Sequence, residues 1–150
     1  GDSNPELFRA WQHLSSAALI SGAFTGVTGA DGAYDAVISE NVPAASMEGG
    51  GFAFHPYLGD GYAGDANRYA ADYGHATLVF GKEDGAESLY SDILSPTDAW
   101  NLDTKMDNGL PGSGRITPLI GAGHTNCVSS ATAYAVASLR RCTAWPIFYR

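Results

Sequence analysis

Near the start of the chain, apolar residues recur at helical spacing. The signals of a helix start come first, in the segment Ser3-Asn4-Pro5-Glu6. Serine and asparagine are suited to N-capping, the proline suits the first turn, and the glutamate is placed to complete a capping box with Ser3. An apolar stripe follows at intervals of three and four residues until Gly22, formed by Leu7, Phe8, Trp11, Leu14 and Ala18. Such a stripe needs a sheet or another helix to cover it. The pattern therefore predicts an amphipathic helix that stops before Gly22 and packs on other elements.

Regular periodicity mostly fails over residues 21–74, where Gly, Asp, Ala and Tyr dominate. This composition predicts long ordered loops around one short strand at residues 52–55. Irregular stretches of this length are either functional or contain elements that the pattern does not reveal, and both interpretations stay open.

A β-rich run over residues 75–80, ended by Gly81, is the clearest strand signal in the chain. Ser95-Pro96-Thr97-Asp98 repeats the helix-start signals, and Asn108-Gly109 supplies a stop, so a short helix is expected between them. Further strands are expected over residues 114–120, 131–139 and 142–149. Pro146 restricts the last of these to a sheet edge or a bulge, because proline cannot donate to a strand ladder.

This order of elements predicts an α+β fold, with the first helix packed across an antiparallel sheet. The length of 150 residues suits a single domain over residues 1–150. Apolar residues form 45% of the chain and charged residues only 16%, which fits a globular domain rich in loops. The net charge of −8 repels phosphate backbones and disfavours nucleic acid as a partner. Because no run of 18 apolar residues occurs, we expect a soluble domain.

The two cysteines, Cys127 and Cys142, have a spacing that matches no metal motif and allows a closed loop. We interpret them as a disulfide of an exported protein, in which closing the loop stabilises the fold by about 3 kcal/mol. The alternative is a pair of buried free thiols in a cytosolic protein.

Two segments resemble a known family. Residues 8–22 read FRAWQHLSSAALISG and resemble the segment after the hydrophobic helix of many proteobacterial prepilin-type proteins, an aromatic-rich helix that ends in a Leu-Ile-x-Gly turn. Residues 99–116 read AWNLDTKMDNGLPGSGRI, which is similar to the pilin-like pattern of an Asp-x-Lys-x-Asp-Asp/Asn-Gly turn followed by Pro, Gly and a strand.

This resemblance to type IV pilins and pseudopilins implies a pilin-like head with a long irregular loop, in which Cys127 and Cys142 fasten the last strands. It implies a structural subunit, rather than an enzyme, of a type IV pilus or a type II secretion pseudopilus, with a mild preference for a minor subunit. Its expected partners are other pilin or pseudopilin subunits and the inner-membrane assembly platform. Its expected location is a periplasmic or extracellular filament. The family's cleaved leader and its hydrophobic helix with an early glutamate do not occur in this sequence, so we expect a head domain without its anchor.

Asp103-x-Lys105-x-Asp107-Asn108-Gly109 resembles the first half of a calcium loop. Lys105 stands where an oxygen ligand belongs, and no bidentate glutamate follows at the required spacing. The favoured interpretation is therefore a helix end closed by Asn108-Gly109, with Lys105 paired to Asp103 or Asp107. Because some pseudopilins hold calcium in a C-terminal loop, Asp103 and Asp107 remain candidate calcium ligands, and no other cofactor is expected.

A tyrosine- and aspartate-rich stretch forms a candidate ligand or partner surface: Tyr57, Asp60, Tyr62, Asp65, Tyr69 and Tyr73. Tyrosine faces stack on sugar rings while carboxylates accept hydroxyl protons, so a secreted carbohydrate- or surface-binding module is the alternative function. The same residues can instead buttress a loop. A hydrolase is disfavoured, because the chain has no G-x-S-x-G elbow, and its histidines show no zinc-ligand spacing.

Overall fold

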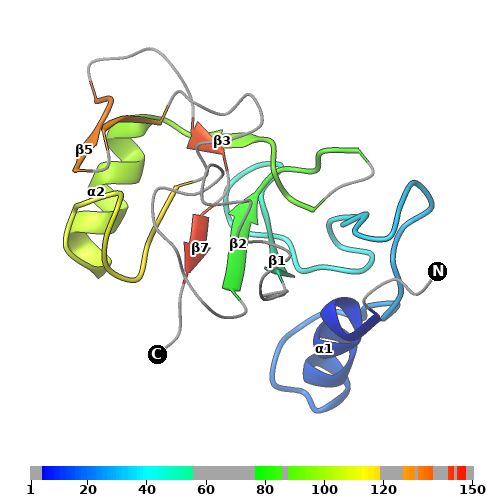
Figure 1. The fold of residues 1–150 in the computed structure, drawn as a ribbon. Coiled ribbons are helices and arrows are strands. Elements are labelled where there is room, and N and C mark those ends of the chain that lie inside the picture. Colours follow the sequence, from blue (N-terminus) through cyan, green and yellow to red (C-terminus); the bar gives the residue numbers. More distant parts are fainter. Residues whose placement is uncertain are drawn as a thin grey trace.

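A computed structural model describes residues 5–55, 77–85, 88–118, 127–130, 132–136, 142–143 and 145–147. The helices are α1 (Pro5–Ser16) and α2 (Pro96–Met106), and they lie on opposite sides of a small central sheet (Figure 1). The strands are β1 (Gly51–His55), β2 (Thr77–Gly81), β3 (Asp92–Leu94), β4 (Val128–Ser130), β5 (Ala133–Tyr134), β6 (Cys142–Thr143) and β7 (Trp145–Ile147). The predicted α+β class, both helices and the disulfide are confirmed.

Helix α1 ends at Ser16, earlier than the apolar stripe predicts. The amide of Leu19 donates to the carbonyl of Leu14 at 3.0 Å, and the amide of Ala18 donates to the carbonyl of Ser15 at 2.9 Å. This bond pair is the Schellman motif, in which the residue after the C-cap is left-handed. Ala18 takes that place with φ of 57°. Because glycine is the usual residue here, the sequence carries no visible stop signal at Ala18.

The central sheet is three-stranded and antiparallel, with β2 between β1 and β7. Phe52 pairs with Phe80 across β1 and β2, and their rings lie 5.2 Å apart between centroids. Pro146 lies opposite Val79 on β7, which pairs only with β2 among the described residues. The predicted edge position of Pro146 is therefore confirmed.

A second antiparallel pair joins β3 to β6, so the segment from Cys142 to Ile147 runs along β3 first and then along β2. Sequence patterning missed β3, which is only three residues long. The strand expected over residues 114–120 does not form within residues 114–118, where Asp107 binds the backbone instead. Of the strand expected over residues 131–139, the described part forms only β5, which pairs with β4. The Thr132 amide donates to the Ser130 hydroxyl between these two strands.

Helix α1 covers part of the sheet by aromatic stacking. The rings of Trp11 and Phe54 lie 4.3 Å apart between centroids, so the apolar stripe of α1 packs on β1 as predicted. A first core cluster joins α1, β1 and β2 around Phe8, Val79 and Leu89. A second cluster lies between α2 and the C-terminal strands and includes the disulfide.

The irregular segment between α1 and β1 is held by its own polar contacts. Asp35 and Asn41 are buried, and the Asn41 side chain donates to the carbonyl of Asp35 at 2.9 Å. The Asp35 carboxylate accepts the amide of Asp31, and the Asn41 side-chain oxygen accepts the amide of Val37. The prediction of a long ordered loop is confirmed for this described part, because buried polar groups are paired locally.

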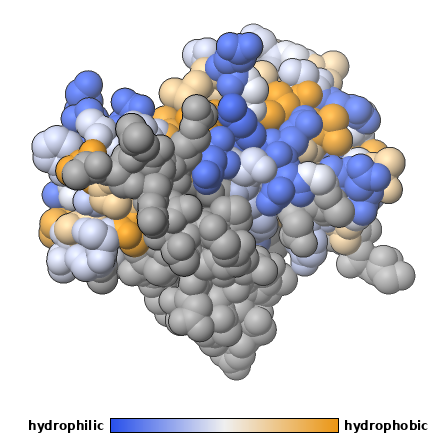
Figure 2. Space-filling model, turned by 90° about the horizontal axis from the view of Figure 1, so that it is seen from above, coloured by the Kyte–Doolittle hydropathy of each residue, from blue (hydrophilic) through white to orange (hydrophobic). Residues whose placement is uncertain are grey.

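In the described part of the chain, neither helix is long and apolar enough to cross a bilayer. Seen from above, hydrophobic residues gather in separate areas of the surface with polar residues between them (Figure 2). Large apolar side chains are exposed near both helices. Leu19 follows the end of α1, Trp100 and Met106 lie on α2, and Leu110 lies in the loop after α2.

Candidate functional site

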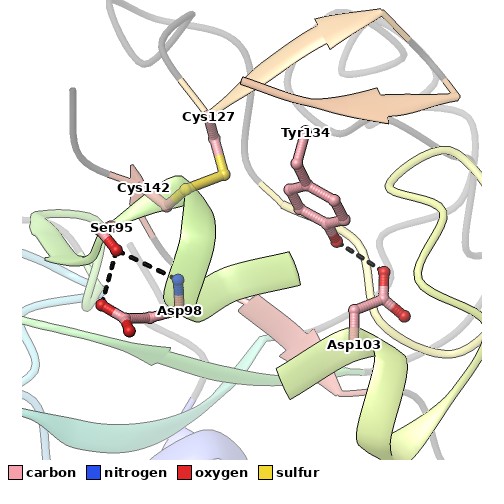
Figure 3. Close-up of a disulfide and its surroundings, with 6 residues drawn as sticks. All are labelled: Ser95, Asp98, Asp103, Cys127, Tyr134 and Cys142. Atoms are coloured by element: carbon pink, nitrogen blue, oxygen red, sulfur yellow. Dashed lines mark hydrogen bonds between the residues drawn. A yellow bond between two sulfur atoms is a disulfide. The ribbon is translucent and has the colours of Figure 1, made fainter. Parts of the chain in front are cut away.

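The most elaborate polar cluster lies at the C-terminal end of α2, where the sequence resembles half of a calcium loop. The signal Ser95-Pro96 positions this helix, because the Ser95 hydroxyl accepts the amide of Asp98 at 3.1 Å, as its N-cap role requires (Figure 3). Eight residues later on the same helix, Asp103 faces the protein interior with no exposed surface.

Asp103 connects three segments through its carboxylate and its backbone carbonyl. Oδ2 accepts the hydroxyl of Tyr134 at 2.6 Å (Figure 3), and Oδ1 accepts the amide of Gly109 at 3.0 Å. The backbone carbonyl of Asp103 also accepts the amide of Asp107 at 2.7 Å. Asp103 therefore ties the end of α2 to the following loop and to the β4–β5 hairpin.

Asp107 closes the same loop from its other side. Its Oδ2 accepts the amide of Arg115, and also that of Ile116 at 3.3 Å. Gly114 has φ of 90°, and a Cβ there would lie 1.9 Å from Asp107 Oδ2, so only glycine fits against this carboxylate. The Thr117 hydroxyl donates to the carbonyl of Pro111 at 2.9 Å and completes the loop.

The electrostatics of the cluster follow from its burial. Burial raises the pKa of Asp103, while the hydrogen bonds from Tyr134 and from the backbone of Gly109 act in the opposite direction. Burial also raises the pKa of the Tyr134 hydroxyl, and the neighbouring Asp103 carboxylate adds to this. Tyr134 therefore stays a neutral donor to Asp103.

The disulfide fixes the hairpin that carries Tyr134. Cys127 and Cys142 are joined with their Cα atoms 4.7 Å apart, and both are fully buried. The amide of Ala135 donates to the carbonyl of Cys127 at 2.9 Å. The predicted disulfide is thus confirmed, and it connects β6 to the segment that holds Tyr134 in place.

Lys105 does not pair with Asp103 or Asp107, contrary to the favoured interpretation of the sequence. The described residues contain one ion pair, between Arg9 and Glu6. Residues two apart on a helix face different directions, so Lys105 points to solvent while Asp103 points inward. The closed helix end is built from backbone amides instead.

The calcium assignment of Asp103 and Asp107 stays a prediction. Their carboxylates accept peptide amides, and the described part of the chain brings no three His, Cys, Asp or Glu side chains together in a metal-binding group. The tyrosine- and aspartate-rich surface lies outside the described residues, with all its members: Tyr57, Asp60, Tyr62, Asp65, Tyr69 and Tyr73.

A second feature, which sequence reasoning missed, is an apolar groove of about 600 Å³ between α2 and the central sheet. Phe52, Phe80 and Leu94 line it from the strands. Polar side chains of α2 also line it, at positions that share one helix face: Asp98, Asn101 and Lys105. The remaining lining residues are Leu102 of α2 and the methionines Met47 and Met106, which are 43% and 54% exposed. No sequence signal marks the groove, because segments far apart in the chain form it.

Comparison with known proteins adds no assignment to this geometry. No family model, curated protein or solved structure matches the chain. The cluster at Asp103 is built to hold backbone segments together, since every described contact of its carboxylates is with an amide or a hydroxyl of the same chain. The groove, in contrast, has a volume within the range of small-molecule pockets.

Proposed function

We propose that the chain is the head domain of a type IV pilin-like subunit, with a structural role in a type IV pilus or a type II secretion pseudopilus. The observation that carries this proposal is the turn after α2. Its Asp-x-Lys-x-Asp-Asn-Gly sequence, which resembles the pilin-like pattern, uses Asp103 and Asp107 to lock the loop that runs to Ile116. The resemblance thus falls on residues with a specific structural role.

Two further features support the proposal. An amphipathic N-terminal helix packs on an antiparallel sheet through Trp11 and Phe54, as expected for a pilin-like head. The Cys127–Cys142 disulfide fastens β6, which continues into the edge strand β7, and the family uses a C-terminal cysteine pair in this way.

The proposed partners are other pilin or pseudopilin subunits and the inner-membrane assembly platform, which the family engages through a hydrophobic N-terminal helix. The proposed location is a filament in the periplasm or outside the cell. An oxidising compartment of this kind allows the disulfide to persist.

The test is the state of the native protein in the cell that produces it. We expect mass spectrometry of sheared surface filaments to contain this chain, joined to an N-terminal hydrophobic helix with an early glutamate and a methylated first residue. In a control strain without the prepilin peptidase, the same chain should remain unprocessed in the membrane fraction. Cleavage by an ordinary signal peptidase, with the chain free in the medium, would overturn the proposal.

A further inference from the structure

The turn after α2 contains the one Asn-Gly pair of the chain, Asn108-Gly109. Such a pair is chemically labile, because the glycine nitrogen can attack the asparagine side chain and no Cβ hinders the approach. The fold nevertheless requires this glycine. Gly109 has φ of 73°, and a Cβ there would lie 2.8 Å from Thr104 Oγ1, so alanine would be both strained and crowded. The end of α2 is therefore built on a pair of residues that can react.

Two hydrogen bonds hold the side chain of Asn108 in this turn. Its Oδ1 accepts the amide of Leu110 at 2.8 Å, which is the bond of an Asx turn, and its Nδ2 donates to the Ser113 hydroxyl oxygen at 3.1 Å. An amide that donates to Oδ1 stabilises the negative charge that develops there when the carboxamide carbon is attacked. The Ser113 hydroxyl can supply a proton to the departing nitrogen. Both ends of the carboxamide therefore have the partner that the reaction needs.

The attacking nitrogen of Gly109 has a proton acceptor. Its amide donates to Oδ1 of Asp103 at 3.0 Å, and Asp103 has no exposed surface. An amide nitrogen must lose its proton to act as a nucleophile, and a carboxylate within hydrogen-bond reach can serve as the general base. The N–H bond lies in the peptide plane, whereas the nitrogen attacks perpendicular to that plane. The bond to Asp103 is therefore compatible with the attack.

We propose that Asn108 is a self-modification site, which is converted to aspartate and isoaspartate through a succinimide. The nitrogen of Gly109 bonds to Cγ of Asn108 while Asp103 accepts the amide proton, and the carboxamide nitrogen takes up a proton and leaves as ammonia. Because Asn108 is exposed, water reaches the ring and opens one of its two carbonyl–nitrogen bonds. Opening at the side-chain carbonyl gives aspartate, and opening at the main-chain carbonyl gives isoaspartate. This chemistry does not depend on the proposed filament role.

Isoaspartate at position 108 would open the turn. It routes the main chain through the former side chain and adds a methylene before Gly109. The amide of Gly109 then moves away from Asp103, and the amide of Leu110 loses the side-chain oxygen that accepts it. The modification would thus loosen the end of α2 as the protein ages. Hydrogen exchange at the amides of Gly109 and Leu110 should be faster in the modified chain.

Peptide mapping by mass spectrometry of the purified chain, incubated near neutral pH, tests the site. Residue 108 should gain the mass that replaces NH₂ by OH, and isoaspartate among the products identifies the succinimide. Asn101 is the internal control and should stay intact, because it is also exposed but precedes a leucine within α2. We expect Asn108 to be converted about tenfold faster in the folded protein than in urea, since positioned acids and bases accelerate reactions by at least that factor. Faster conversion in urea would overturn the proposal.

The variant Asp103→Asn tests the general base. Its neutral side-chain oxygen can still accept the Gly109 amide, so the turn is kept while the proton acceptor is weakened. Conversion of Asn108 should slow by about tenfold relative to the wild type. An unchanged rate in the variant, with its fold verified by circular dichroism, would refute the proposed reaction. If the variant does not fold, the comparison between folded and urea-unfolded wild type decides, because it needs no substitution.

Discussion

The hydrogen bond between Tyr134 and Asp103 allows a quantitative test of how the C-terminal hairpin is held on α2. Both residues are buried, and the 2.6 Å bond donates to a carboxylate. In Tyr134→Phe the hydroxyl is lost and the buried carboxylate keeps only its amide partners. Because hydrogen bonds to charged groups contribute about 1.5–3 kcal/mol, we expect the free energy of unfolding to fall by about 2 kcal/mol at neutral pH.

The loss should depend on pH with a defined sign. Burial raises the pKa of folded Asp103 above its unfolded value, so the folded state binds more protons between the two values and stability falls as pH rises through that window. The Tyr134 bond lowers this pKa, and its removal raises the folded pKa further. Tyr134→Phe should therefore cost more at pH 7 than near pH 4, where much of folded Asp103 is protonated.

Urea unfolding followed by tryptophan fluorescence, with the disulfide intact, measures both effects. The matched background is Asp103→Asn, in which a neutral amide can still accept the Gly109 amide and bond to the Tyr134 hydroxyl. There Tyr134→Phe should cost about 1 kcal/mol at either pH. Equal costs of Tyr134→Phe at both pH values and in both backgrounds would refute the role given to the buried carboxylate.

Three further predictions concern Ala18, the disulfide and Gly81. Ala18→Gly should raise the free energy of unfolding by about 0.5–1 kcal/mol, because glycine relieves the left-handed strain at this cap. A urea titration that finds the variant no more stable than the wild type would contradict this strain. Reducing the bond between Cys127 and Cys142 should lower the free energy of unfolding by about 3 kcal/mol, and mass spectrometry after alkylation of the unreduced protein should find no free thiol. Gly81→Ala should cost about 3 kcal/mol or prevent folding, because its Cβ would lie 2.0 Å from the carbonyl oxygen of Leu89, and a thermal melt close to that of the wild type would contradict the close approach.

Gly85→Ala is the control for Gly81→Ala. A Cβ at Gly85 would meet nothing within 4 Å, so only its φ of 55° opposes alanine. The expected cost is about 1 kcal/mol, and a larger loss than at Gly81 would show that crowding by Leu89 is not the cause.

The parts of the fold that local signals determine could be predicted from the sequence. Ser95 and Pro96 predicted the start of α2, and the structure has the Ser95 cap bond at that position. The β-rich run before Gly81 predicted β2, and the missing amide of Pro146 predicted an edge strand. Each of these inferences depends on the chemistry of one to six neighbouring residues.

The parts that depend on distant contacts could not be predicted. The partner of Asp103 is Tyr134, 31 residues away, and no spacing rule connects them. Within residues 114–118, the expected strand does not form, because the carboxylate of Asp107 accepts the amides of Arg115 and Ile116. Helix α1 ends in a Schellman turn whose left-handed residue is Ala18 instead of the usual glycine, so residue type did not reveal the end of the helix.

The position of β7 has a consequence for biosynthesis. Strand β2 is complete at Gly81, but its second neighbour is formed by residues 145–147. While the chain emerges from the ribosome, the edge of β2 at Leu78, Val79 and Phe80 lacks that neighbour until more than 60 later residues have followed. An unpaired apolar strand edge is a site of aggregation. A chaperone that shields this edge during synthesis would therefore have to remain bound until the C-terminal segment arrives.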